Sequence, residues 1–255
     1  MRAMLTGYRF QLQVMRMQRD SWLSLVTAPF FAVIFLALIR QAGRQDLTGT
    51  AVLAPALITL WSMSLTVSGE IVDSDRWLGT LELAVAAPVR LSALVAGRIL
   101  AVSSAALLAV PESLLVARLG FGARLELFHP VVLLLAVIAT AVAMSGTALV
   151  MTALFVVTRT ARTFQNSSSY PFYVLSGVMV PLSLLPVWVR PLGRLIFLSW
   201  SADLLRACLR PAPIEAVPAR LGAILLLGAA GYLLGSRLLA RMLDRVRATG
   251  SVSLA

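Results

Sequence analysis

The chain has 255 residues, of which 59% are hydrophobic and only 13% are charged. An average soluble domain carries about 25% charged residues, so this composition excludes an ordinary soluble globule and a disordered chain. All 22 basic residues are arginine, and without lysine the chain has neither a phosphate-binding P-loop nor a Schiff-base site. With one cysteine, Cys208, and one histidine, His129, it can form no intrachain disulfide or multi-histidine metal centre, and neither residue receives a role.

Residues 1–20 are expected to form an amphipathic helix lying in the membrane interface. Arg2, Arg9 and Arg16 recur every seven residues, and an apolar stripe runs beside them from Met1 to Met15. This pattern is typical of helices that lie on a bilayer rather than cross it. The alternative interpretation is a positively charged tail that only sets the topology.

Six apolar segments follow, and a spanning helix needs about 20 mostly apolar residues. The expected spans are about 21–39, 47–69, 91–117, 130–157, 168–189 and 221–239, followed by a flexible tail at 248–255. Six spans place both termini on one side, and the four arginines in each terminal segment favour the cytoplasm. We interpret the net charge of +11 as this topology signal together with contact with membrane lipids, not as binding of nucleic acid.

The third span contains two charges, Arg98 and Glu112. We expect Arg98 to extend toward the inner headgroups, as long basic side chains do near span ends; the alternative is a substrate ligand. Glu112 follows Pro111 near the outer face, where it could pair with a basic side chain or contact a cationic substrate. In the sixth span, Gly228, Gly231 and Gly235 are spaced to permit close helix packing.

The inner loop at 70–90 is unusually acidic. Glu70, Asp73, Asp75 and Glu82 are four of the eleven acidic residues in the chain, although membrane insertion does not require them. Together with Trp77, they suggest a docking element for another protein. The alternative for the loop is that it only connects two spans in the solvent. The alternative for Trp77 is that it lies in the belt of aromatic residues at the membrane interface.

The region from 170 to 220 is the second anomaly. Pro171, Pro181 and Pro186 interrupt the fifth apolar segment, which suggests re-entrant half-helices in the outer region 190–220. Asp203 and Arg206 have the i, i+3 spacing of a helical ion pair, and with Pro181, Pro186 and Trp188 they are candidates for an outer gate. The alternative is one kinked span followed by an outer loop.

At these positions the sequence resembles the permease subunits of type-2 ATP-binding-cassette exporters, especially their drug-resistance branch. The resemblance rests first on the basic amphipathic N-terminus. It rests next on an inner block comprising Asp75-Arg76, Gly79-Thr80-Leu81-Glu82, Ala87-Pro88 and Gly97-Arg98. It rests last on an outer series comprising Ser176-Gly177, Pro181, Pro186-Val187-Trp188 and Asp203-Leu204-Leu205-Arg206.

This resemblance implies an all-α membrane protein with six transmembrane helices, an interfacial helix and outer re-entrant half-helices. Two copies of a separate ATPase subunit, holding ATP and magnesium, would dock beneath a pair of such permeases, identical or related. The chain itself would be no enzyme, would bind no cofactor, and would lie in a bacterial plasma membrane. The docking residues would be Asp73, Asp75, Arg76, Trp77, Gly79, Thr80, Leu81, Glu82 and Pro88.

Few charges lie in the expected spans, so we expect an amphiphilic or hydrophobic substrate, such as a drug, an antibiotic or a lipid. Polysaccharide export remains an alternative, because that branch has the same layout. A stand-alone secondary carrier also remains, although such carriers usually show internal repeats and intramembrane acids, and Glu112 is the single candidate acid here.

Overall fold

The computed structural model describes residues 2–17, 20–77, 91–123, 126–157 and 161–249. Within these ranges every regular element is a helix, which confirms the expected all-α membrane fold. The α-helices are α1 (Arg2–Met17), α2 (Asp20–Gln41), α3 (Thr48–Trp77), α5 (Leu91–Ala106), α6 (Ala109–Phe121), α7 (Pro130–Val157), α8 (Ala161–Leu175), α9 (Arg190–Arg194), α10 (Phe197–Cys208) and α11 (Val217–Thr249). Two short 3₁₀ helices, η1 (Gln45–Leu47) and η2 (Leu182–Leu184), complete the set.

Four segments among the described residues are long and apolar enough to cross a membrane: Thr48–Thr66, Leu91–Phe121, Pro130–Leu154 and Val217–Met242. A shorter apolar helix covers Leu25–Gln41. The second of these segments combines α5 and α6, which are separated at Leu107 and Leu108. Pro111 lies in the first turn of α6, and its ring is incompatible with a regular helical carbonyl at Leu107, so the helix is interrupted there.

The expected fifth span, residues 168–189, is not one continuous helix. α8 accommodates Pro171 within it and ends at Leu175. Gly177 then adopts φ +70°, a left-handed conformation that glycine adopts at little cost after a helix. Because the chain turns here, the outer region of short helices begins well before residue 190.

The last helix also differs from the expected range. α11 runs for 33 residues, so the arginines that follow the apolar segment, from Arg237 onward, still lie on the helix. The expected tail begins on this helix, and its residues 250–255 lie outside the described part of the chain.

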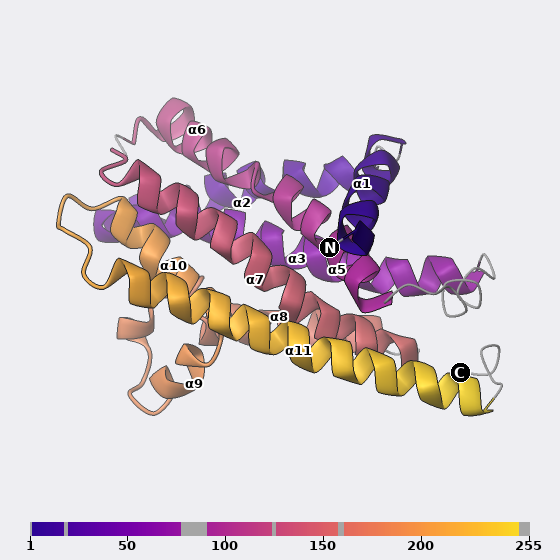
Figure 1. Ribbon diagram of the computed structural model, residues 1–255. Helices are drawn as coiled ribbons and strands as arrows, with labels where there is room; N and C mark the ends of the chain where they lie inside the picture. Colours follow the sequence, from indigo (N-terminus) through magenta and orange to yellow (C-terminus); the bar gives the residue numbers. More distant parts are fainter. Residues whose placement is uncertain (1, 18–19, 78–90, 124–125, 158–160, 250–255) are drawn as a thin grey trace.

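The helices form an elongated bundle with two distinct ends (Figure 1). The end of α3, the start of α5 and the end of α11 lie toward one end, and α1 crosses the bundle on this side. α9, α10 and the turn into α11 lie toward the other end. We call these the α1 side and the α10 side.

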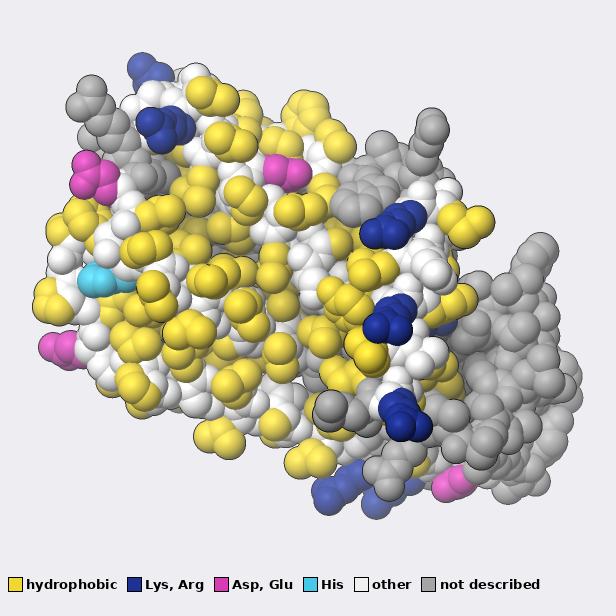
Figure 2. Space-filling view, turned by 45° about the horizontal axis from the view of Figure 1, so that its top comes forward, with side chains coloured by type: hydrophobic (Ala, Val, Ile, Leu, Met, Phe, Trp, Pro, Cys, Tyr) yellow, Lys and Arg dark blue, Asp and Glu magenta, His cyan; other side chains and the backbone are white. Residues whose placement is uncertain are grey.

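Close backbone packing joins the two longest apolar helices. A Cβ atom on Gly228 of α11 would overlap Ala143 of α7, and one on Gly235 would lie 2.7 Å from the backbone nitrogen of Val150. These contacts confirm that the glycines permit close packing. Side chains as large as Phe30, Leu115, Leu134 and Leu226 are exposed on the outer faces of α2, α6, α7 and α11. Figure 2 shows a broad hydrophobic face with a row of arginine side chains along one border, as expected for a surface in contact with lipid.

Candidate functional site

The first candidate region is the contact between α1 and α5 on the α1 side. A Cβ atom on Gly7 would overlap the backbone carbonyl of Leu94, and one on Gly97 would overlap that of Met4. The two backbones therefore approach more closely than any other residue type would allow at either position. α1 is held against the bundle as one unit with α5.

Arg98 adds a polar contact to this junction. Its Nε atom donates a hydrogen bond to Oε1 of Gln11 at 3.0 Å, and its guanidinium lies 5.1 Å from the ring centroid of Phe10. Gln11 is only 4% exposed. Arg98 thus links α5 to α1, a more specific role than the extension toward headgroups expected from the sequence.

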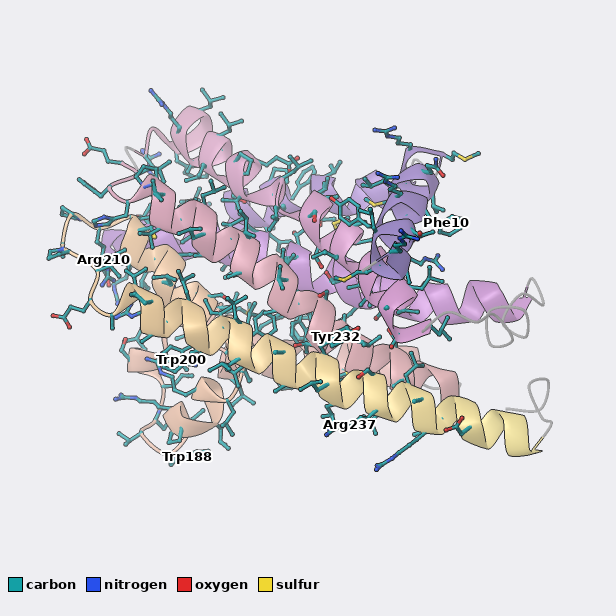
Figure 3. The ribbon with its side chains drawn as sticks, in the orientation of Figure 1. Phe10, Trp188, Trp200, Arg210, Tyr232 and Arg237 are labelled. Carbon is teal, nitrogen blue, oxygen red and sulfur yellow. The ribbon has the colours of Figure 1, made fainter. Side chains whose placement is uncertain are left out.

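The buried face of α1 is made by Gly7, Gln11 and Met15. These residues are spaced i, i+4 and differ from the apolar stripe expected from the sequence. Gly7 has no side chain, so the backbone of α1 can approach α5 at this face. Arg2, Arg9 and Arg16 remain exposed. The contact with lipid headgroups expected for them stays a prediction. Figure 3 shows Phe10 on the same helix.

The expected docking residues divide between a helix and an undescribed segment. Asp73, Asp75, Arg76 and Trp77 lie on the last turns of α3, although their side chains are not among those described. Gly79, Thr80, Leu81, Glu82 and Pro88 lie outside the described residues. The segment 78–90 connects α3 directly to α5, which is the helix that carries α1.

The second candidate region is an ion-pair cluster on the α10 side. The carboxylate of Asp203 in α10 forms two ion pairs, one with Nη1 of Arg206 and one with Nη1 of Arg194, each at 3.0 Å. Nη2 of Arg206 also donates a hydrogen bond to the carbonyl of Gly177. The cluster therefore ties α10 to α9 and to the turn after α8.

Trp200 reinforces the link to α9. Its Nε1 atom donates a hydrogen bond to the carbonyl of Arg194 at 2.9 Å, and the Arg194 guanidinium lies 4.7 Å from the Trp200 ring centroid. Such a cation–π contact adds to the ion pair with Asp203. α9 and α10 are thus fixed to each other by side chains on both.

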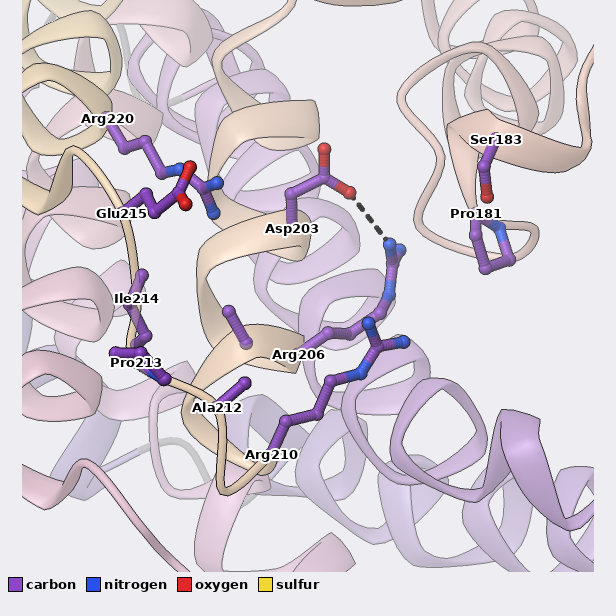
Figure 4. Close-up of a pocket in the computed structure, with 11 residues that line it drawn as sticks. Pro181, Ser183, Asp203, Arg206, Arg210, Ala212, Pro213, Ile214, Glu215 and Arg220 are labelled. Carbon is purple, nitrogen blue, oxygen red and sulfur yellow. Dashed lines mark hydrogen bonds and ion pairs between the residues drawn. The ribbon is translucent and has the colours of Figure 1, made fainter.

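A cavity of about 360 Å³ opens beside this cluster (Figure 4). Of the five outer gate candidates, Pro181, Asp203 and Arg206 line it. Pro186 and Trp188 do not line it, and Trp188 is 76% exposed. The sequence did not single out Arg210, Glu215 and Arg220 as lining residues. The concentration of arginines between 190 and 220 could have indicated a charged site in this region.

Glu112 lies apart from these candidates, in the first turn of α6. Its Oε2 atom is buried, and no described residue gives it a hydrogen-bond partner. A cavity of about 760 Å³ lies next to α6, lined by residues that include Pro111 and Arg118 but not Glu112. Across the described ranges, no three His, Cys, Asp or Glu side chains group closely enough to hold a metal ion.

Comparison with known proteins identifies the family of the chain. No curated protein matches it. The profile of the ABC-2 type transporter family matches residues 5–209, from the first turn of α1 to the end of α10. Members of this family generally work with a separate ATPase subunit. Because the match covers most of the chain, this protein belongs to the ABC-2 type transporter family and is a membrane permease of an ABC transporter.

Proposed function

We propose that this permease belongs to an exporter that moves an amphiphilic or hydrophobic molecule out of the cell, using ATP hydrolysed by a separate subunit. Two ATPase subunits, carrying ATP and magnesium, dock beneath a pair of permeases, identical or related. The α1 side faces the cytoplasm of a bacterial cell, and both termini lie there. The arginines of α1 and of the end of α11 support this orientation.

The observation that carries this proposal is the rigid junction between α1 and α5. The proposed docking segment, from Asp73 to Pro88, continues directly into α5. A displacement of that segment by the ATPase therefore moves α5, and α1 moves with it because Gly7 and Gly97 bring the two backbones into contact. Packed elements of this kind transmit small shifts as rigid units.

The composition of the spans supports an amphiphilic or hydrophobic substrate. The described surfaces of α2, α6, α7 and α11 are largely apolar, and a strongly anionic substrate would find few cations at membrane depth. Glu112 is our candidate for a polar contact along the substrate path, because its Oε2 atom is buried without a partner, which is costly unless a donor reaches it. Polysaccharide export is the alternative within the same family.

A charge-reversal variant tests the docking claim. We expect Asp73→Arg, Asp75→Arg and Glu82→Arg together to release or uncouple the ATPase and to leave membrane insertion intact. The measurement is recovery of the ATPase with the tagged permease and ATP-driven transport in vesicles. A matched control reverses exposed acids on the α10 side, Asp46→Arg and Glu126→Arg, and should leave both intact. Normal ATPase recovery and transport in the triple variant would remove the docking claim.

A further inference from the structure

We propose that the cavity beside α10 is a phosphate-binding site that holds the headgroup of an anionic phospholipid. The site combines the arginines at the end of α10 with Pro181 and Ser183, which lie at the start of η2 and line the same cavity (Figure 4). It does not depend on which molecule the permease transports, because it concerns a lipid bound at the edge of the α10 side.

The charges lining the cavity favour an anion. Three arginines, Arg206, Arg210 and Arg220, face two carboxylates, Asp203 and Glu215. Asp203 is also shared with Arg194, which does not line the cavity. The local charge is therefore positive even when both carboxylates are ionised, and an added anion would relieve the repulsion among the guanidinium groups.

Two of these arginines are arranged as a pair. Arg206 is 8% exposed and is fixed by Asp203 and by the carbonyl of Gly177. Arg210 is one turn further along the chain, its positive charge acts on Arg206, and Figure 4 draws its side chain next to that of Arg206. No described carboxylate lies within ion-pair distance of Arg210, so its guanidinium is available to a ligand. Paired guanidinium groups are well suited to the oxygens of a phosphate.

The surroundings favour a phospholipid over free phosphate. Pro181 and Ser183 line the cavity, and the chain that follows them exposes large apolar side chains. These are Leu184, Val187, Trp188, Leu192 and Leu195, each more than half exposed. A headgroup in the cavity would leave its acyl chains beside this apolar surface, whereas a free phosphate ion would use none of it.

The test measures binding of short-chain lipids to the purified full-length chain in detergent. The probes are a phosphatidylglycerol, a diacylglycerol with the same acyl chains, and inorganic phosphate. The variants are Arg210→Gln and Arg210→Gln with Arg220→Gln, which leave the Arg206–Asp203 pair in place. Arg118→Gln, an exposed arginine at the end of α6, is the matched control. Size-exclusion profiles and thermal unfolding establish that each variant is folded.

We expect phosphatidylglycerol to bind at least tenfold more tightly than diacylglycerol, and the double variant to lose at least that factor. Arg118→Gln should bind like the unmodified protein. Equal binding of phosphatidylglycerol by the folded double variant and the unmodified protein would overturn the site. Inorganic phosphate binding as tightly as the lipid would overturn the assignment to a lipid headgroup.

Discussion

A Cβ atom on Gly97 would overlap the carbonyl oxygen of Met4, so α5 and α1 are in backbone contact at this point. The contact involves a main-chain atom, which cannot rotate away as a flexible side chain could. The position of α1 therefore depends on glycine at residue 97, and any larger side chain must push the two helices apart.

We predict that Gly97→Val separates transport from ATP hydrolysis. Overpacking of this kind costs about 1–3 kcal/mol, and here it is directed at the α1–α5 junction. In the purified complex, ATPase activity should persist while transport falls at least tenfold. Gly222→Ala in α11 is the control, because a Cβ atom there meets nothing within 4 Å. Transport at the unmodified rate in Gly97→Val would contradict the role of the junction.

We predict that replacing Asp203 lowers the free energy of unfolding more than replacing Arg194, its more exposed ion-pair partner. Asp203→Asn weakens the compensation of the buried Arg206 guanidinium, with an expected cost of about 1–3 kcal/mol. Arg194→Gln removes an ion pair whose arginine side chain is 44% exposed, and should cost less than about 1 kcal/mol. Thermal unfolding in detergent measures both. A larger loss in Arg194→Gln than in Asp203→Asn would show that the cluster is organised differently.

The packing of α7 against α11 gives a third prediction. Gly228→Val places a branched side chain against Ala143, which is fully buried. We therefore expect the free energy of unfolding to fall by about 1–3 kcal/mol and the unfolding temperature to fall with it. Gly222→Ala on the same helix should be neutral or slightly stabilising, since alanine is the better helix former. Equal unfolding temperatures for the two variants would argue against close packing at Gly228.

The loop between α2 and α3 gives a prediction for pH. The hydrogen bond and ion pair with Arg44, at 2.9 Å, lower the pKa of the Asp46 carboxyl below its ordinary value. Any stability from this exposed pair is therefore present above the unfolded-state pKa of about 3.9 and is lost as pH falls through the lowered folded value. The difference in unfolding temperature between the unmodified protein and Asp46→Asn should be small at pH 7 and should shrink in strong acid. A difference that grows on acidification would contradict this sign.

The helical membrane fold was predictable because long apolar segments leave few other structures in a bilayer. The interruptions were harder to predict. Pro171 lies inside α8 without ending it, whereas the chain turns at Gly177, just after α8 ends. Whether a proline or a glycine interrupts a helix therefore depends on its neighbours. The split between α5 and α6 near Pro111 likewise required the three-dimensional structure.

The site was predictable where residues are close in sequence and not where they are distant. The i, i+3 spacing predicted the Asp203–Arg206 pair, and the 3.0 Å contact confirms it. Nothing in the spacing linked Arg206 to Gly177 or Gln11 to Arg98, because those contacts depend on how separate helices pack.

The central claim is that this permease moves only when an ATPase subunit drives it. The direct test is transport of a fluorescent amphiphile in vesicles containing the permease with or without its ATPase, with ATP or an ion gradient supplied. We predict transport only when the ATPase and ATP are both present. Transport by the permease alone, driven by an ion gradient, would contradict the account.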